Sequence, residues 1–205
     1  MRAAATIPKF VLLEEFLFPD ELAGLLDYAI SREADFQAGT VMTAESEQAV
    51  MLDHRRSRLL FDLGPYFSLV TDRMRCCFDF VLEKLGHERF PVLGFDAEIT
   101  ASNDGDFFGP HRDVDEANAT RELSFVYYFH REPKMFSGGE LRIYEEGIWE
   151  HDAIVPGQNF MVLFRAGTIH EVSAVHCPSG EFADSRFALN GWIHCDRNAE
   201  PANSR

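Results

Sequence analysis

The stretch 105–113 (GDFFGPHRD) ends in a His-x-Asp triplet, in which His111 and Asp113 lie two positions apart. Residues i and i+2 of a strand, or of the segment that leaves it, project to the same side. One imidazole nitrogen and one carboxylate oxygen on the same side can bind a single divalent metal ion. We expect His170 to complete this set as a third ligand. Two histidines and one carboxylate leave coordination positions open, whereas a structural zinc site uses four protein ligands.

The triplet is a weak signal by itself, because His194 and Asp196 repeat the same spacing near the end of the chain. The residues that follow distinguish the two occurrences. His111 is followed by His170, just after the turn Ala166-Gly167, and then by Arg186 at the start of an apolar segment. No histidine follows His194, so no later ligand could complete a site there. His130, which precedes Arg131 at the end of an expected strand, is predicted to lie on the surface.

The elements that must position these residues are short strands. After Gly94, segments of β-type composition alternate with turn signals such as Asn103-Asp104-Gly105 and Pro156-Gly157. Several short strands without intervening helices predict a sandwich or a barrel. The expected strands are 95–102, 121–130, 139–145, 153–165, 168–176 and 186–194.

The N-terminal part is expected to hold helices. Residues 6–18 predict a strand or an extended lead-in, Pro19-Asp20 opens a helix, and a short strand is expected near 37–42. A second helix over 65–85 presents one apolar stripe and stops at Gly86. The stripe consists of Phe67, Val70, Met74, Phe78, Val81 and Leu85.

The charged run 53–58 is predicted to be a solvated face or loop, with the alternative that it lines the mouth of a substrate cleft. The fold class is therefore mainly β with N-terminal helices. We expect a single domain over 1–205, with a helical support region at 1–92 and a β core at 93–196, and a frayed end at 197–205.

Composition excludes several classes of function. The formal net charge of −15 disfavours nucleic acid and anionic membrane surfaces as partners. The four cysteines have neither disulfide-framework nor zinc-ribbon spacing, which is typical of a reducing compartment. No clean apolar leader and no run long enough to span a bilayer is found. We therefore predict a soluble, cytoplasmic protein.

Four motifs in this order resemble the 2-oxoglutarate/Fe(II)-dependent dioxygenase superfamily, and most nearly its prolyl 4-hydroxylase-like branch. They are His-x-Asp, SGGELRI (137–143), GTIHEV (167–172) and RFALNGW (186–192). The resemblance covers about residues 93–195. It implies a double-stranded β-helix, or jelly roll, which agrees with the strand pattern.

The resemblance implies that His111, Asp113 and His170 bind Fe(II). It also implies that Arg186 pairs with the distal carboxylate of 2-oxoglutarate, a role that suits the two-pronged guanidinium group. Tyr128 matches a tyrosine whose hydroxyl assists the same carboxylate.

Further residues are expected to line the pocket. Leu141 and Trp192 match pocket positions, although both are equally well explained as core residues. Phe107 or Phe108 is expected to face the substrate from a rim formed by residues 105–110.

The implied reaction is a hydroxylation that uses 2-oxoglutarate and O₂, with ascorbate as a supporting reductant. Oxygen would enter a C–H bond of a prolyl or other residue of a protein or peptide, or of an amino-acid-like small molecule, with release of succinate and CO₂. Two alternatives stay open: a 2-oxoglutarate-independent, cupin-type metalloenzyme and a non-catalytic jelly-roll binding module. No motif indicates the substrate or the oligomeric state.

Two departures from the family pattern stand out. Residues 176–185 form an insertion between His170 and Arg186, which we interpret as a lid loop, with a second metal site at His176 and Cys177 as the less favoured hypothesis. The tyrosine usual about ten residues before the first ligand is absent, and Thr100 or Ser102 could substitute for it.

Overall fold

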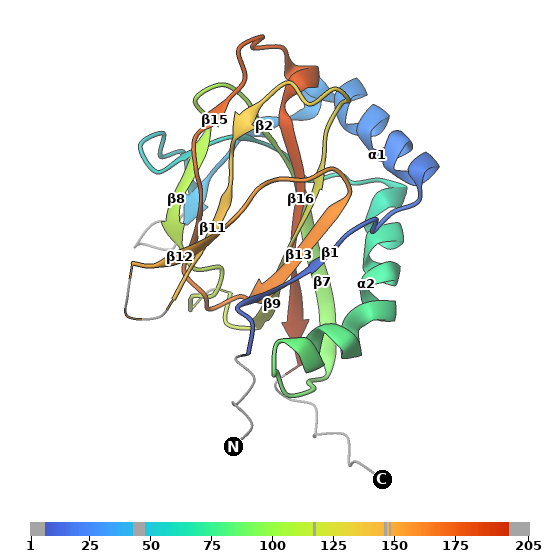
Figure 1. Cartoon of the computed structure of the whole chain (residues 1–205), viewed down its shortest axis with the longest axis vertical. Coiled ribbons are helices and arrows are strands. Elements are labelled where there is room, and N and C mark those ends of the chain that lie inside the picture. Colours follow the sequence, from blue (N-terminus) through green and yellow to red (C-terminus); the bar gives the residue numbers. More distant parts are fainter. Residues whose placement is uncertain (1–6, 43–47, 117, 146, 148, 197–205) are drawn as a thin grey trace, which may run out of the picture.

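Two antiparallel β-sheets face one another, and a pair of helices covers the larger sheet (Figure 1). The computed structural model describes residues 7–42, 48–116, 118–145, 147 and 149–196, so the expected frayed end at 197–205 lies outside the described residues. The predicted fold class, mainly β with N-terminal helices and a jelly-roll core, is confirmed. No helix in the described part of the chain is long and apolar enough to cross a bilayer.

The larger sheet has seven strands in the order β1 (Phe10–Leu13), β13 (Phe160–Arg165), β9 (Arg121–Phe129), β16 (Arg186–Cys195), β7 (Val92–Ser102), β6 (Arg58–Leu60) and β2 (Gln37–Ala38). The smaller sheet has five, in the order β12 (His151–Ile154), β11 (Leu141–Tyr144), β14 (His170–Val172), β8 (Phe107–His111) and β5 (Arg55–Arg56). Two further pairs are β10 (Ser137–Gly138) with β15 (Val175–His176), and β3 (Val41–Met42) with β4 (Gln48–Ala49).

The strands β9, β16 and β7 in the middle of the larger sheet present side chains to both of its faces. In β9 the odd-numbered residues 123–129 belong to the core beneath the helices, whereas the even-numbered ones face the smaller sheet. β7 and β16 repeat this alternation, as the period of two in a strand requires. The inward-facing residues of the three strands are Glu98, Thr100, Ser102, Ser124, Val126, Tyr128, Arg186, Ala188, Asn190 and Trp192.

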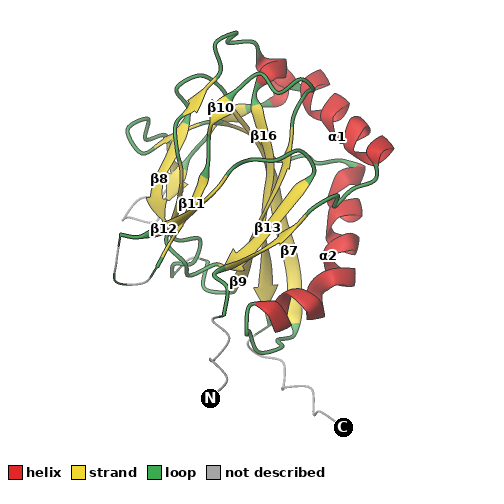
Figure 2. Ribbon diagram, in the orientation of Figure 1, coloured by secondary structure: helices red, strands yellow, loops and turns green. Residues whose placement is uncertain are grey.

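Two helices cover the outer face of the larger sheet (Figure 2). α1 (Pro19–Ser31) begins at the predicted proline, whose missing N–H costs nothing in the first turn. α2 (Pro65–Lys84) buries most of its predicted stripe, but Phe67 is 36% exposed. Phe67 lies in the first turn of α2. Its position on the apolar side of the helix is not enough to bury the ring, because burial also requires a neighbouring element that covers it. Two short 3₁₀ helices, η1 (Glu33–Asp35) and η2 (Phe182–Asp184), complete the elements.

The N-terminal part also supplies strands. β1, β2 and β6 join the larger sheet, and β5 joins the smaller one beside β8. The charged run 53–58 contains β5 and the first residue of β6. Arg55 within it is buried, so the prediction of a solvated face is wrong for this residue. The expected strand 153–165 is divided between β12 and β13 at Pro156-Gly157, and 168–176 is divided between β14 and β15.

His130 is buried, being 4% exposed, so its predicted surface position is wrong. Its Nδ1 lies 2.9 Å from the carbonyl oxygen of Arg131, and its ring meets Phe136 edge-on at 5.5 Å. The even-numbered residues of β9 face inward. Residue 130 continues this alternation one position beyond the end of the strand, so its side chain faces inward as well.

Met74→Ala is expected to lower the free energy of unfolding by about 2–5 kcal/mol, because it leaves a cavity beneath α2. Phe67→Ala, on the same helix, is expected to lower it by about 1 kcal/mol or less, because the ring is exposed. Urea denaturation of both variants measures the difference. Equal losses would show that α2 buries its first turn as well.

His130 predicts a pH dependence of stability. Burial lowers its pKa below the ordinary value, and the Arg131 carbonyl and Glu132 oppose this only in part. The folded protein then binds fewer protons here than the unfolded chain, so stability should fall as the pH drops below about 6.5, by at most about 1.4 kcal/mol per pH unit. His130→Leu is expected to reduce this slope in urea titrations between pH 7.5 and 5, whereas the exposed-site variant His176→Gln should keep it. An unchanged slope in His130→Leu would contradict the expectation.

Candidate metal centre

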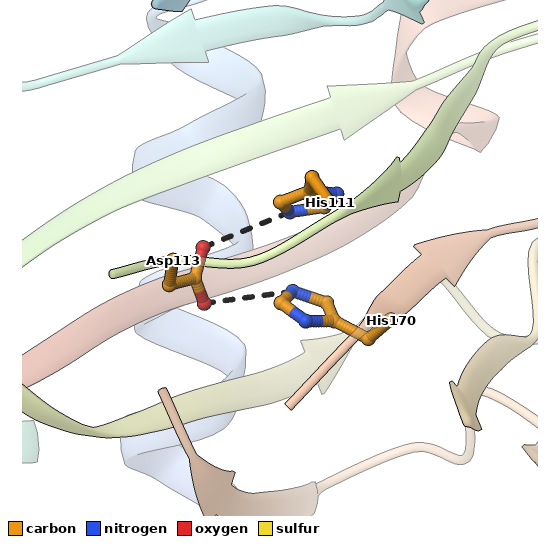
Figure 3. Close-up of side chains that lie close together, drawn as sticks. All are labelled: His111, Asp113 and His170. Atoms are coloured by element: carbon orange, nitrogen blue, oxygen red, sulfur yellow. Dashed lines mark ion pairs between the residues drawn. The ribbon is translucent and has the colours of Figure 1, made fainter. Parts of the chain in front are cut away.

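His111, Asp113 and His170 converge on one point between the sheets (Figure 3). His111 ends β8, His170 begins β14, and the two residues are directly paired across the antiparallel ladder. Asp113 follows two residues after His111. Its Oδ1 lies 3.6 Å from Nε2 of His111, and its Oδ2 lies 3.5 Å from Nε2 of His170. The three ligand atoms lie within 4.8 Å of one another, a spacing that one metal ion could bridge.

Each imidazole is oriented by the backbone carbonyl two residues before it in the sequence. Nδ1 of His111 lies 2.9 Å from the carbonyl oxygen of Gly109, and Nδ1 of His170 lies 3.0 Å from that of Thr168. A carbonyl can only accept, so Nδ1 carries a proton in both rings, and Nε2 is the nitrogen that faces Asp113. This arrangement fixes the tautomer that a metal ligand needs.

Asp113 is held by groups that the triplet alone does not reveal. The Ser124 hydroxyl donates to Oδ2 at 2.6 Å. Arg121 donates to the Asp113 backbone carbonyl at 3.2 Å, and its guanidinium lies 3.6 Å from the centre of the Trp192 ring. These contacts set the direction of the carboxylate before any metal binds.

The protonation states suit metal binding. Burial and the neighbouring His170 lower the pKa of His111 to about 3, so its ring is neutral near pH 7. Burial alone would raise the pKa of Asp113, but the two imidazoles, Ser124 and Trp192 together lower it below its ordinary value. A neutral imidazole and an ionised carboxylate are the forms that bind divalent metals.

A second polar group lies deeper between the sheets. Arg186 begins β16, is 3% exposed, and donates through Nε to the carbonyl oxygen of Gly139 at 2.9 Å. Its guanidinium carbon lies 4.9 Å from the centre of the Tyr128 ring. The Tyr128 hydroxyl is buried and has no hydrogen-bond partner among the described residues. Burial raises the pKa of this hydroxyl against the opposing charge of Arg186, so it keeps its proton. A carboxylate bound here could accept from both residues.

The predicted pocket residues line one cavity, which also contains the His-Asp-His triad and Arg186. Leu141 and Trp192 contribute to its wall, as do Phe107 and Phe108. The Phe108 ring stacks on His111 with 3.6 Å between ring centres. Thr100 and Ser102 also face this cavity, where a tyrosine was expected from the family pattern.

Sequence reasoning missed several residues of the site. Ser124 could have been found, because it shares the inward face of β9 with Tyr128 at an even spacing. Arg55 lies in the run 53–58, for which the mouth of a cleft was the alternative interpretation, but its pairing with Glu98 could not have been predicted, because it depends on how the two sheets face each other. Arg55 and Glu98 line both the inner cavity and an outer groove of about 680 Å³.

The insertion 176–185 lines neither cavity. It packs at the Arg186 end of the sheets, where the ring of Phe182 meets Phe187 edge-on at 5.3 Å. Asn103 ties it down by donating to the Glu181 carbonyl and to Ser185, both at 2.9 Å. In this structure the insertion therefore packs beside the start of β16, away from the residues that line the two cavities, and not over the site as the predicted lid would.

Comparisons with known proteins agree with this site. The family model described as the 2OG-Fe(II) oxygenase superfamily matches residues 97–194. An uncharacterized PKHD-type hydroxylase from Synechocystis is 32% identical over 197 residues, which are 91% of this chain and 63% of the relative. The chain thus spans about three-fifths of that relative's length.

Solved structures share the fold. A prolyl 4-hydroxylase from Pseudomonas putida superposes with a TM-score of 0.67 at 19% identity, covering 92% of this chain and 93% of the other. A prolyl hydroxylase from Trichoplax adhaerens has a TM-score of 0.68 at 17% identity, covering 91% and 84%.

The fold and the triad describe a jelly-roll protein in which two histidines and one carboxylate could hold a single metal ion. In its sequence the chain is similar to the 2-oxoglutarate/Fe(II)-dependent oxygenase superfamily and to a PKHD-type hydroxylase, and its fold is shared with prolyl hydroxylases. This confirms the resemblance found in the sequence motifs.

Ser124→Ala is expected to weaken Mn(II) binding by about 10- to 100-fold, because groups that orient a metal ligand contribute that much to affinity. Calorimetric titration of the metal-free protein measures it. Ser179→Ala is the matched control, since it removes a hydroxyl-to-carboxylate bond, to Asp184 at 2.9 Å, away from the triad. Equal affinities of the two variants would show that Ser124 does not set the Asp113 geometry.

Proposed function

We propose that this chain is a 2-oxoglutarate- and O₂-dependent hydroxylase acting on a prolyl or other residue of a peptide, with release of succinate and CO₂. The observation that carries the proposal is a single cavity lined by both the His-Asp-His triad and Arg186, whose guanidinium carbon lies 4.9 Å from the centre of the Tyr128 ring. A metal suits the triad, and a dicarboxylic acid suits the guanidinium group.

His111, Asp113 and His170 would hold Fe(II). Two imidazole nitrogens and one carboxylate oxygen are the donor set of non-haem Fe(II) oxygenases, and they leave the remaining positions for co-substrate and O₂. When bound, the iron and 2-oxoglutarate supply the oxidising power for the reaction. The chain's own part is to fix the ligands, through Gly109, Thr168 and Ser124, and to keep the ring of Phe108 against His111.

Arg186 and Tyr128 would bind the distal carboxylate of 2-oxoglutarate. The guanidinium has donors beyond the one that Gly139 uses, and the buried Tyr128 hydroxyl lacks a partner in the described structure. A buried donor without a partner destabilises the protein, and a hydrogen bond to a bound carboxylate would remove this cost. This pair also favours the proposal over a 2-oxoglutarate-independent cupin-type enzyme, whose reaction gives Arg186 no role.

A peptide is favoured over a small molecule as the substrate. The outer groove of about 680 Å³ reaches the triad and is lined by apolar residues such as Met51 and Phe61. It offers more room than an amino acid needs. The Trichoplax prolyl hydroxylase was solved with a peptide fragment bound, and its fold matches this chain. Mass spectrometry of a proline-centred peptide library, incubated with Fe(II), ascorbate and 2-oxoglutarate, would identify the hydroxylated sequence.

Arg186→Gln is expected to raise the KM for 2-oxoglutarate by about 30-fold or more. Removing one partner of a buried charge pair costs about 2–5 kcal/mol, and each 1.4 kcal/mol is a factor of ten. The measurement is 2-oxoglutarate decarboxylation as a function of its concentration. Metal affinity should stay within a factor of two, because Arg186 does not contact the triad.

Arg56→Gln is the control, since Arg56 lies on β5 but lines neither cavity, and its KM should match the native protein. Asp113→Ala is the negative control and should lose both metal and turnover. Full turnover by Arg186→Gln without 2-oxoglutarate would overturn the proposal in favour of the cupin-type alternative. No consumption of 2-oxoglutarate by the native protein with any peptide would favour a binding module.

A further inference from the structure

An ion pair joins the two sheets at the entrance to the metal centre. Arg55 comes from β5 of the smaller sheet and Glu98 from β7 of the larger one, and Nη2 of Arg55 lies 3.1 Å from Oε1 of Glu98. Both residues are only 9% exposed. A charged pair buried between two sheets, with no role in the triad, calls for a functional explanation, because burying charges rarely stabilises a fold.

The pair lies at the boundary of two spaces. Arg55 and Glu98 line the inner cavity with the triad, and they also line the outer groove. A substrate that reaches from the groove toward the triad therefore passes beside this pair. Its side chains are placed to contact the substrate close to the group that reacts.

Arg55 is held rigidly. Its Nε donates to the Ser57 hydroxyl at 3.0 Å, its Nη1 donates to the Thr40 carbonyl at 3.1 Å, and its Nη2 pairs with Glu98. Its guanidinium carbon also lies 4.6 Å from the centre of the Phe108 ring, which stacks on His111. Each guanidinium nitrogen is therefore used within the protein, and Arg55 acts on a ligand through Glu98.

Glu98 can still accept hydrogen bonds. An ionised carboxylate offers about four acceptor positions, and the bond from Arg55 takes one of them. The positive charge of Arg55 offsets the negative charge of Glu98. The carboxylate can therefore accept a hydrogen bond from a neutral N–H group and does not strongly favour a cation over it. The rest of the groove is balanced as well, because Arg112 and Arg121 line it together with Asp113 and Asp115. This local balance, in a chain of net charge −15, suits an uncharged, hydrogen-bonding ligand.

We propose that Glu98, held by Arg55, accepts a main-chain N–H of the peptide substrate next to the residue that enters the inner cavity. This subsite rests on the proposed function, and it adds the group of the substrate that is recognised. It makes Glu98 a substrate-binding residue and Arg55 a positioning residue.

The test replaces single main-chain amides of a hydroxylated library peptide by esters, which removes one N–H at a time. Peptide affinity is measured by calorimetry with Mn(II) and 2-oxoglutarate bound, so no turnover is needed. For the native protein, one ester close to the target residue is expected to bind about 10- to 100-fold more weakly than the amide, as for a hydrogen bond to a charged group. Other ester positions should change affinity by less than threefold.

The double variant Arg55→Met/Glu98→Met removes the pair as a unit, so that no unpaired charge stays buried. In this variant the amide and the ester are expected to bind equally, within a factor of two. Glu98→Gln, which introduces a donor beside the acceptor, should reduce the amide preference to less than fivefold. Glu33→Gln is the matched control, because it alters an exposed ion pair with Arg58, at 3.3 Å, on the neighbouring β6. It should keep the full preference.

Each outcome decides between the proposals. An amide preference that persists in the double variant, or the absence of any sensitive position in the native protein, would overturn the Glu98 subsite while leaving peptide hydroxylation intact. If the native protein neither binds nor hydroxylates any library peptide, peptide hydroxylation itself is overturned, and the subsite falls with it.

Discussion

The register between β8 and β14 is the constraint on which the metal centre depends. It places His111 directly opposite His170, so that two rings from segments about sixty residues apart in sequence meet with 4.2 Å between their centres. Each ring is then locked by the carbonyl two residues before it on its own chain segment. A shift of one residue would turn one ring to the opposite face of the sheet. Asp113 needs only to follow β8 by two residues to meet both Nε2 atoms.

The larger sheet supplies Ser124, Tyr128 and Arg186 through the alternation of side chains along its strands. The outward residues of β7, β9 and β16 form the main core under α1 and α2, and the inward residues of the same strands form the floor of the site. Ser124, Tyr128 and Arg186 are thus fixed by the packing of their neighbours Phe125, Tyr127 and Phe187. The rigidity of the site therefore derives from the hydrophobic core, and a separate scaffold is unnecessary.

Most of the fold and the position of the triad could be predicted from the sequence, because strand composition and ordered motifs are local signals. Contacts between the two sheets could not. The segment 107–111 was expected as a rim, since Gly109 and Pro110 are poor strand formers, yet β14 and β5 pair with it on both sides. Arg55 was expected in solvent because charged runs usually are, whereas its partner Glu98 lies on the opposite sheet. Phe67 had the right helical angle but lacked a covering neighbour.

β5, which carries Arg55, lies outside the part of the chain that the family model matches. The family model covers residues 97–194, which contain the triad, Arg186 and Tyr128, whereas Arg55 comes from outside that range. β5 is also the edge strand of its sheet and only two residues long. Edge positions tolerate substitution better than central ones, since only one side must preserve its hydrogen bonds. β5 can therefore vary without disturbing the triad or Glu98, which lie in the part of the chain that the family model covers, so that homologues with the same triad could hold Glu98 differently and accept different substrates.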